Sequence, residues 1–392
     1  MMLRKIAGPF IIGATLVSFS ASAEPNPFTD SAAHWAKESI EKAVGKGYVD
    51  GYEDRTFRPD LSVTRAEFVK MVVTALKLSV NGKASDGEWY LPYVNVAVGA
   101  GIHRWSDFSS GDWNTPITRQ EMSRMIVRAT DKELQKPDAA KSDSELMYLA
   151  AKAGLIQGLS GGQLGESEAT TRAQSVTVIE RILTVNGGGK LEVDKHAVNR
   201  AELAWHKTNI FTVMPEFFGK VSPTSKWNPD NMFVETPDGN YRGELDALIA
   251  IDLDDLDDPH RDMVDISNLK WLNLRAAKAQ PVSELKGAYL LYFKSRVVYN
   301  HDPQTYSTGY DYMLYSVTGF KPNFEEERKG NLSAFSQTSY QDFLKGKFPA
   351  AVISKNAETG DDIFVSIQSS AIPPNNTYDK RLIWTIPVKR SE

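Results

Sequence analysis

One segment of the sequence matches the pattern of a nucleophilic serine, Gly158-Leu159-Ser160-Gly161-Gly162. This G-x-S-x-G pattern activates a serine where a strand leads through a sharp turn into a helix. The residues before this segment have a helical pattern, so we interpret it as an ordinary loop. The chain contains no cysteine, which excludes a cysteine nucleophile, a thiolate metal site and disulfide bonds.

Histidines and carboxylates are the other groups that could act in catalysis. His206, His260 and His301 lie far apart in the chain, and the H-E-x-x-H segment of a zinc enzyme is absent from the sequence. Carboxylates are numerous enough for a glycosidase pair, which must face each other across a sugar. We therefore identify no catalytic residue. Convergence of four candidates in one cleft would indicate an enzyme: Asp252, Asp254, Glu284 and His301.

The segment Asp252–Asp258 is rich in aspartate and offers the hard oxygen ligands that calcium prefers. It lacks the D-x-D-x-D-G spacing of an EF-hand loop, because Leu256 and Asp257 stand where the third ligand and the glycine should be. A solvated acidic loop is the alternative that we favour. We accordingly predict neither a metal site nor a cofactor.

Three tetrads place an arginine at the start of a helix. Thr64-Arg65-Ala66-Glu67, Thr118-Arg119-Gln120-Glu121 and Thr171-Arg172-Ala173-Gln174 recur at nearly equal intervals. Each fits the capping box of a helix N-terminus. There the threonine hydroxyl accepts a hydrogen bond from the amide of the third helical residue, and the Glu or Gln side chain at that residue accepts one from the amide of the threonine. Apolar residues follow each tetrad at helical spacing, so each tetrad begins an amphipathic helix.

A glycine lies at one fixed distance before each tetrad, at Gly47, Gly101 and Gly154. Apolar residues at helical spacing precede each glycine, and glycine suits the left-handed position that follows a helix. The repeating unit is therefore a helix, a glycine turn, a loop and a capped helix. Three such units together can bury apolar faces that one unit cannot.

The first unit carries further landmarks in a fixed order: Phe28-Thr29-Asp30, His34-Trp35-Ala36, Gly47 to Tyr52, Phe57-Arg58-Pro59-Asp60 and then the first tetrad. This succession resembles the S-layer homology repeat, and the resemblance covers residues 26–183. It implies repeats at 24–80, 81–136 and 137–185. In that family three repeats form an all-α module with pseudo-threefold symmetry.

The resemblance also implies a function, because the grooves of this family bind secondary cell wall polymer, often through a pyruvylated amino sugar. A pyruvyl ketal presents a carboxylate. A guanidinium at a helix N-terminus can bind both oxygens, and free amides at the helix end would help. We expect non-covalent anchoring to a bacterial cell-wall polysaccharide, with a glycan linked to peptidoglycan as the alternative partner.

Eight residues are carried over as ligand contacts by this resemblance. The arginines are the primary candidates, although they could instead pair with loop carboxylates such as Asp60. The tryptophans could stack on a sugar or lie in the core. The eight are Arg65, Arg119, Arg172, Asp30, Trp35, Gly51, Trp89 and Gly158.

The three units are not equivalent. Trp105 stands in the second unit where Gly51 and Gly158 stand in the others, and a bulky indole there could close a groove. The third unit has Ser142 in place of the tryptophan, and its tetrad ends in Gln174. We therefore expect fewer than three working grooves, with the arginine of the first tetrad as the best contact.

Beyond a glycine-rich linker at 186–190, residues 191–392 resemble no family that we recognise. We predict a β-rich α+β domain with helices at Val193–Lys207 and Ser339–Leu344, and a hairpin turn at Asp238-Gly239. Six tyrosines could line a sugar-binding face or belong to strand cores: Tyr289, Tyr292, Tyr306, Tyr310, Tyr312 and Tyr315. The predicted strands are Ile210–Met214, Met232–Glu235, Ala288–Phe293, Tyr310–Val317, Ala351–Ser354, Ile363–Ile367 and Leu382–Val388.

Residues 1–23 have the basic start, the short apolar stretch and the small-x-small ending of a signal peptide. No later segment approaches the ~20 apolar residues of a membrane span. The net charge of −5 offers no basic surface for nucleic acid, so an anion must be bound by local arginines. We expect a secreted surface protein of a Gram-positive envelope that displays a binding or structural domain. A wall-tethered polysaccharide hydrolase and an S-layer lattice component are the alternatives.

Overall fold

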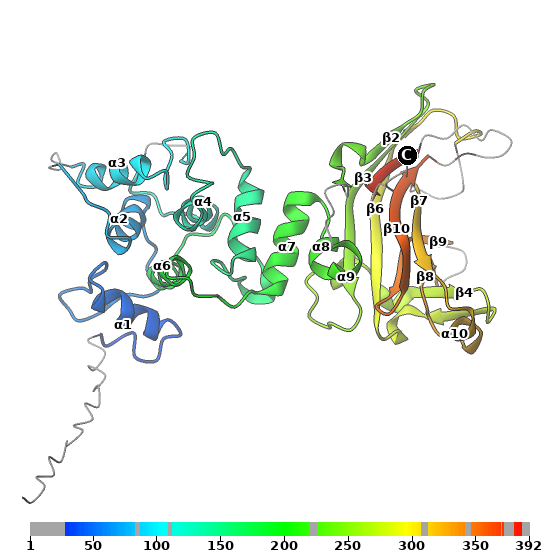
Figure 1. Ribbon diagram of the computed structural model, residues 1–392, viewed down its shortest axis with the longest axis horizontal. Coiled ribbons are helices and arrows are strands. Elements are labelled where there is room, and N and C mark those ends of the chain that lie inside the picture. Colours follow the sequence, from blue (N-terminus) through cyan, green and yellow to red (C-terminus); the bar gives the residue numbers. More distant parts are fainter. Residues whose placement is uncertain are drawn as a thin grey trace, which may run out of the picture.

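Helices fill the N-terminal part of the chain and antiparallel sheets fill the C-terminal part, so the protein is an α+β protein of more than one layer (Figure 1). The computed structural model describes residues 28–82, 87–108, 112–219, 226–306, 313–341, 346–369, 371 and 380–385. The predicted signal peptide, residues 1–23, lies outside the described residues.

The first six helices form three consecutive pairs: α1 (Lys37–Gly45) and α2 (Arg65–Ala75), α3 (Leu91–Gly99) and α4 (Arg119–Thr130), and α5 (Asp143–Lys152) and α6 (Arg172–Asn186). The three predicted capping boxes are confirmed at the starts of α2, α4 and α6. The glycines that follow α1, α3 and α5 have φ values of 70° to 72°, as predicted for a left-handed cap. Local sequence therefore sets both ends of each loop.

The three pairs close into a ring. The second helix of each pair packs on the first helix of the next, α2 on α3 and α4 on α5, and α6 packs on α1. Three residues directly before the cap threonines meet at the centre. Val63 N donates to Thr170 O (2.9 Å), Thr170 N to Ile117 O (2.8 Å) and Ile117 N to Val63 O (2.9 Å). This closed cycle of hydrogen bonds joins the three loops at corresponding positions.

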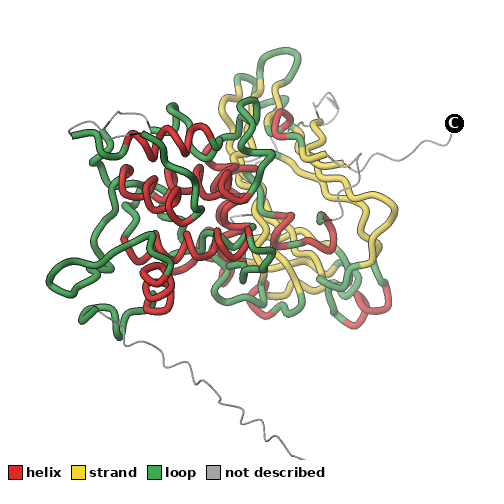
Figure 2. The backbone as a smooth tube through the Cα atoms, turned by 60° about the vertical axis from the view of Figure 1, so that its left-hand side comes forward, coloured by secondary structure: helices red, strands yellow, loops and turns green. Residues whose placement is uncertain are grey.

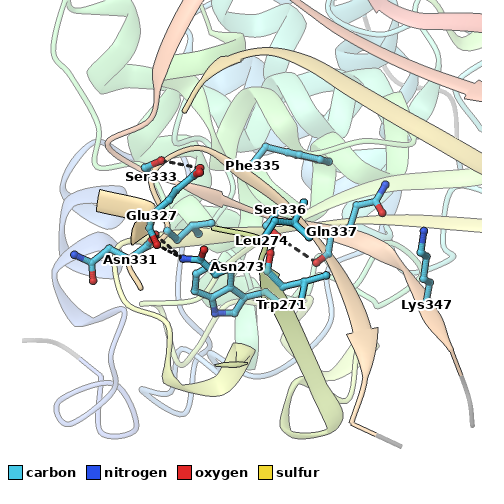
Figure 3. Close-up of a pocket in the computed structure, with 12 residues that line it drawn as sticks. Trp271, Asn273, Leu274, Glu327, Asn331, Ser333, Phe335, Ser336, Gln337 and Lys347 are labelled. Atoms are coloured by element: carbon cyan, nitrogen blue, oxygen red, sulfur yellow. Dashed lines mark hydrogen bonds between the residues drawn. The ribbon is translucent and has the colours of Figure 1, made fainter. Parts of the chain in front are cut away.

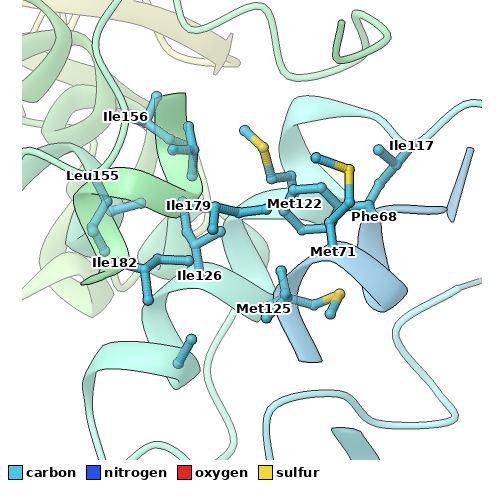
Figure 4. Close-up of a cluster of buried hydrophobic side chains, with 14 of the residues drawn as sticks. Phe68, Met71, Ile117, Met122, Met125, Ile126, Leu155, Ile156, Ile179 and Ile182 are labelled. Carbon is cyan, nitrogen blue, oxygen red and sulfur yellow. The ribbon is translucent and has the colours of Figure 1, made fainter. Parts of the chain in front are cut away.

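Apolar side chains from α2, α4 and α6 fill the middle of the ring (Figure 4). Phe68, Met122, Met125 and Ile126 are fully buried there. A seventh helix, α7 (Lys195–His206), belongs to the same core, because its residues Ala197, Val198 and Ala201 are buried against it and the helix packs on α5. The helical core therefore continues past residues 186–190.

The C-terminal part contains two antiparallel sheets, which lie beyond α7, α8 (Ile210–Val213) and α9 (Pro215–Phe218) in Figure 1. Figure 2 shows the strands gathered on one side of the molecule and most of the helices on the other. A four-stranded sheet has the order β1-β11-β10-β7, and a seven-stranded sheet has the order β2-β3-β6-β9-β8-β4-β5. The strands are β1 (Lys226–Trp227), β2 (Phe233–Glu235), β3 (Tyr241–Asp252), β4 (Leu269–Asn273), β5 (Lys278–Pro281), β6 (Ala288–Asn300), β7 (Leu314–Lys321), β8 (Phe335–Tyr340), β9 (Lys347–Ser354), β10 (Glu358–Gln368) and β11 (Lys380–Thr385).

Both faces of the larger sheet are covered. Leu248 and Ala250 of β3 pack in one core with Ile363 and Val365 of the smaller sheet. The alternate residues of β3 pack in a second core with the loops on the opposite face. A short helix, α10 (Phe324–Lys329), lies beside β4 (Figure 1).

Several strand predictions are confirmed, and so is the hairpin turn at Asp238-Gly239, which joins β2 to β3. The predicted strand Ile210–Met214 is wrong, because residues 210–213 form the helix α8. The carboxylate of Glu202 accepts bonds from Phe211 N (3.1 Å) and from the Thr212 hydroxyl and so favours a helical turn. The predicted helix Ser339–Leu344 is also wrong, since residues 339 and 340 belong to β8, and residues 342–345 lie outside the described residues.

Candidate functional site

Groove A is a cavity of about 360 Å³ at the junction of the three helix pairs. The first pair supplies its walls, the start of α3 supplies an indole and the start of α6 supplies a guanidinium. Its lining residues are Gly47, Tyr48, Val49, Asp50, Glu67, Lys70, Met71, Thr74, Trp89 and Arg172.

Groove B is a second cavity, of about 270 Å³, at an equivalent place in the ring. The third pair supplies its walls, the segment before α1 supplies an indole and the start of α4 supplies a guanidinium. Its lining residues are Trp35, Arg119, Ile156, Gln157, Gly158, Leu159, Gln174, Thr177, Val178 and Arg181.

The two grooves are built from corresponding positions of the three units. Glu67 of groove A and Gln174 of groove B are both the third residue of a capped helix. Trp89 and Trp35 both stand two residues before the first helix of a pair. Each groove thus joins the walls of one pair to the tryptophan of the next pair and the arginine of the preceding one.

The two groove arginines are held in the same way. Arg172 donates from Nε to Phe57 O (2.9 Å) and from Nη2 to Asp50 O (2.8 Å). Arg119 donates from Nε to Leu164 O (2.6 Å) and from Nη2 to Gln157 O (2.7 Å), and Gln157 holds the loop position that corresponds to Asp50. In each case Nη1 has no hydrogen-bond partner among the described residues. Burial lowers the pKa of both arginines, but a guanidinium remains charged in proteins.

The two groove tryptophans are exposed to solvent. The exposed fraction is 65% for Trp35 and 40% for Trp89. The ammonium of Lys70 lies 5.7 Å from the centre of the Trp89 ring. These indoles are therefore rim residues of the grooves, and neither belongs to the core.

A further cation distinguishes each groove, and sequence reasoning missed both. Groove A has Lys70 where groove B has Thr177, and groove B has Arg181 where groove A has Thr74. Arg181 donates to Leu155 O (3.2 Å), and burial lowers its pKa. These residues lie at fixed offsets after the cap threonines, so the repeat register was the signal that could have found them.

The third equivalent place in the ring is filled by ion pairs within the protein. Arg65 is 6% exposed and pairs with Glu121, which is 7% exposed. Arg65 Nη1 donates to Asp112 O (3.1 Å). Nearby, Arg124 pairs with Asp143 (2.7 Å). The arginine expected to be the best ligand contact therefore lines neither groove.

A buried carboxylate reinforces this closure. Asp107 lies 2.6 Å from Arg128 and 3.2 Å from His103. Burial alone would raise the pKa of Asp107, but the bonds from His103 and Arg128 outweigh it and lower the pKa to about 2. The carboxylate is therefore ionised at neutral pH and neutralises the cations around it.

The helix ends do not offer free amides. The first two amides of α4 donate to Glu168 O (2.9 Å) and Glu166 O (3.0 Å), and the starts of α2 and α6 bond the loops of neighbouring pairs in the same manner. The third amide of each helix is bonded by its cap threonine. The expectation that these amides help to bind an anion is therefore wrong.

Comparison with known proteins identifies part of this ring. Residues 27–69 match the family model described as the S-layer homology domain. The chain carries an S-layer homology domain. This domain contributes α1, most of the walls of groove A and the tryptophan of groove B.

Three relatives show where this similarity is found. The exoglucanase XynX of Acetivibrio thermocellus is 31% identical over 175 residues, which are 40% of this chain and 16% of the relative. A cellulosome-anchoring protein of the same organism is 36% identical over 87 residues, 21% of this chain and 20% of the relative. The S-layer protein sap of Bacillus anthracis is 32% identical over 104 residues, 25% of this chain and 13% of the relative. The chain spans a fifth or less of the length of these relatives.

The remaining predicted contacts of the S-layer homology domain are structural in this geometry. Asp30 accepts bonds from Phe57 N and Arg58 N, both at 2.8 Å, so each carboxylate oxygen already holds a loop amide. A Cβ atom at Gly51 would overlap the ring of Phe28. These two residues shape the loop beside groove A and are absent from its lining.

The glycine positions of the other two units differ from one another. Gly158 lines groove B, and a Cβ atom there would lie 2.5 Å from the Cα atom of Gly162. Trp105, at the corresponding place in the second unit, is 57% exposed and meets Trp113 edge to face. Ion pairs fill the third place in the ring, and the indole of Trp105 lies largely exposed beside them.

Asp252 and Asp254 lie together at one end of the β3–β6 strand pair, whereas His301 follows β6 at the other end. Asp252 and Asp254 both pair with Lys355, at 2.6 Å and 2.8 Å, and His301 stacks on Tyr299. Within the described ranges, no group of three or more histidine, aspartate or glutamate side chains is arranged to hold a metal ion. The serine of the Gly158–Gly162 segment lies in a 3-10 turn after a helix, as expected for a loop.

Among the described residues, the predicted tyrosines pack against two different cores and do not share one face. Tyr289 and Tyr306 are buried, and the hydroxyl of Tyr306 donates to Asp238 at 2.7 Å. The hydroxyl of Tyr315 donates to Ala350 O. Tyr310 and Tyr312 lie outside the described residues.

A cavity of about 440 Å³ lies where β4 and β8 separate (Figure 3). Its polar side chains are largely bonded to each other and to nearby backbone. Asn273 donates to Glu327 O (2.9 Å), Ser333 donates to the Glu327 carboxylate (3.1 Å), and Ser336 donates to Leu272 O (2.7 Å). Its apolar lining includes Trp271.

No helix in the described part of the chain has the length and apolar character that crossing a bilayer requires.

Proposed function

We propose that this protein binds a bacterial cell-wall polysaccharide non-covalently, through three S-layer homology repeats at 24–80, 81–136 and 137–185. One observation supports this most directly. Grooves A and B, which are built from corresponding positions of the ring, each combine an exposed indole with a guanidinium whose Nη1 is unpaired among the described residues. A guanidinium binds a carboxylate through directed hydrogen bonds, and an indole offers a flat apolar surface to a sugar ring.

The ligand that this chemistry fits is an anionic sugar such as a pyruvylated amino sugar of a secondary cell wall polymer. Groove B favours it most, because Arg119 and Arg181 face the same cavity and neither forms an ion pair with a carboxylate of the described residues. In the third place Arg65 is buried in an ion pair with Glu121, so its guanidinium is not presented to a ligand. We infer two working grooves, which bind one polymer more tightly together than either does alone.

This function implies a place for the protein. A secreted chain held by wall polymer lies on the surface of a Gram-positive envelope, with residues 191–392 displayed as a binding or structural domain. Relatives named as an S-layer protein and as a cellulosome-anchoring protein support this location. The acidic net charge and the paired cations support neither nucleic acid nor a membrane surface as partner.

Co-sedimentation with purified Gram-positive cell walls tests the proposal. We expect the full chain to sediment with the walls and the double variant Trp35→Ala/Trp89→Ala to remain in the supernatant, because each substitution removes an exposed rim indole. Leu256→Ala, at an exposed apolar residue of the C-terminal part, is the matched control. Equal sedimentation of the wild type and the double variant would exclude the grooves.

The nature of the polymer is tested with treated walls. Mild acid removes pyruvyl ketals, so we expect sedimentation to be lost with acid-treated walls and with peptidoglycan stripped of its secondary polymer. Full sedimentation with acid-treated walls would mean that the ligand carries no pyruvyl group. Full sedimentation with stripped peptidoglycan would identify peptidoglycan itself as the partner.

A further inference from the structure

A row of aromatic rings runs without interruption from the rim of groove A across the second helix pair. Trp89 meets Tyr90 edge to face, with ring centres 5.9 Å apart. Tyr90 stacks on Trp113 at 5.2 Å with the planes 24° apart. Trp113 in turn meets Trp105 edge to face at 6.4 Å. The rings come from the start of α3, from the loop after α3 and from the residues before α4.

The two ends of this row are exposed and its middle is fixed. Trp89 and Trp105 have exposed fractions of 40% and 57%, whereas Tyr90 and Trp113 are half-buried. The carbonyl of Trp113 accepts a bond from Ala66 N at the start of α2 (3.0 Å). Large apolar side chains exposed in a connected row are uncommon on a monomer and mark a binding surface.

We propose that this row, which we call the aromatic track, binds the sugar units of the wall polysaccharide that continue beyond the unit held in groove A. The inference rests on the proposed function of groove A. Trp89 lines that groove, so the track begins where the cavity ends. Trp105 stands at the position of Gly158, which lines groove B. The second pair thus has its own groove closed by Arg65 and Glu121 and carries an aromatic surface beside it.

The chemistry of the track favours a glycan over a protein partner. Indole and phenol rings present rigid flat faces that lose little conformational entropy on binding. A stable protein interface buries roughly 1,000 Å² or more, which a single row of four rings does not provide. The ammonium of Lys70 lies 5.7 Å from the Trp89 ring and 5.9 Å from the Tyr93 ring. A cation therefore lies beside the groove end of the track, which suits an anionic polymer.

Chain length of the ligand separates the track from the groove. The full protein is titrated with intact polysaccharide released from Gram-positive walls, and with short oligosaccharides cut from the same polysaccharide. We expect Trp105→Ala to weaken binding of the polysaccharide about tenfold, the usual loss for a buried indole contact, and to leave binding of the oligosaccharides unchanged. Trp89→Ala should weaken both, and Leu256→Ala neither.

Each other result has a definite meaning. Unchanged binding of the polysaccharide by Trp105→Ala, with wild-type binding intact, overturns the track and leaves the proposed function standing. If the wild type binds neither ligand, the proposed function fails and the track fails with it. Sedimentation velocity of the free proteins completes the test, because a change of oligomeric state in Trp105→Ala would make the row a contact between copies of the chain and overturn the glycan assignment.

Discussion

Arg65 and Glu121 form an ion pair between two units of the ring, and this pair is buried where the other two places are open. Arg65 Nε lies 3.2 Å from the carboxylate of Glu121, which also caps α4. Gln174 stands at the corresponding position of groove B and carries no charge. Glu67 holds the same position in groove A, which is open, so the closed place is distinguished by the ion pair of Glu121 with Arg65 and not by the carboxylate alone.

We expect Glu121→Gln to lower the free energy of unfolding by about 3 kcal/mol, because it leaves the buried guanidinium of Arg65 without its counter-charge. The capping box itself should survive, since Gln174 fills the same role in α6. Urea denaturation of the full chain measures the loss. The double variant Arg65→Met/Glu121→Gln should recover most of it, because no charge is then left buried.

Equal losses in the single and the double variant would show that the pair acts by shape and not by charge. Arg65→Met alone supplies a second check through wall binding. It should bind cell walls as the wild type does, since Arg65 lines neither groove.

Lys70 of groove A and Arg181 of groove B should each contribute to the affinity of their own groove for an anionic sugar. Lys70→Thr copies the residue of groove B into groove A, and Arg181→Thr copies the residue of groove A into groove B. Each substitution removes one charged contact, so we expect each to weaken its own groove for an anionic oligosaccharide about tenfold. Titration calorimetry at low salt measures this, and added salt should reduce the difference.

The charge-matched control is Lys278→Thr, at an exposed lysine of β5 that lies in neither groove. The double variant Lys70→Thr/Arg181→Thr should lose more affinity for the intact polymer than the two single losses suggest, because both attachments of one chain are weakened. Identical titrations of the wild type and both single variants would exclude these cations from the site.

The candidate site was predictable as far as it depends on local sequence. The capping boxes placed Arg119 and Arg172, and the family resemblance placed Trp35 and Trp89. Which residues of different units line the same groove was not predictable, since each groove combines residues far apart in the chain. The role of Glu121 is the clearest case, because its type is the same as that of Glu67 and only the spatial neighbour differs.

The C-terminal part shows a different limit. Strands with continuous apolar runs, such as the start of β6, were predicted, whereas β3 was missed although it lies inside the larger sheet. Its first half alternates between buried and partly exposed residues as a strand should, but Gly243 occupies one of the inward positions and weakens the apolar half of the pattern. Helix α8 was misread because Glu202, which favours its first turn, is eight residues upstream in another helix.

Helix α7 should be needed for groove B even though it follows the predicted linker at 186–190. Asp194, the cap of α7, accepts a bond from Gly158 N (3.0 Å), and Arg200 donates to Gly161 O (3.1 Å). A fragment of residues 28–186 should therefore unfold at a temperature ~10 °C below that of a fragment of residues 28–207, which retains the apolar contacts of α7.

Differential scanning calorimetry compares the two fragments, and oligosaccharide titration should show weaker binding by the shorter one. Arg200→Ala in the longer fragment removes the bond to Gly161 O and keeps the cap of α7, so it separates this loop contact from the helix packing. If both fragments melt together and bind alike, the helical domain ends at the linker and α7 belongs to the C-terminal part.

A buried carboxyl at the junction of the two parts should make stability depend on pH. Glu202 of α7 is fully buried, and burial raises its pKa from 4.5 to about 7 despite the bonds that it accepts from α8. Below pH 4.5 the group is protonated in both the folded and the unfolded chain. Between pH 4.5 and 7 the unfolded chain loses this proton while the folded chain keeps it, so stability falls as the pH rises.

We therefore expect Glu202→Gln to gain up to about 3 kcal/mol of unfolding free energy relative to the wild type between pH 4.5 and pH 7.5. The buried His260, whose pKa burial lowers to about 4, acts in the opposite direction, since its contribution to stability is lost as the pH falls below 6.5. That contribution is the same in both proteins, so it cancels in the difference. Urea denaturation of the wild type and the variant across this pH range measures the gain. A difference that stays constant with pH would mean that Glu202 is ionised in the folded protein and that its hydrogen bonds to α8 outweigh its burial.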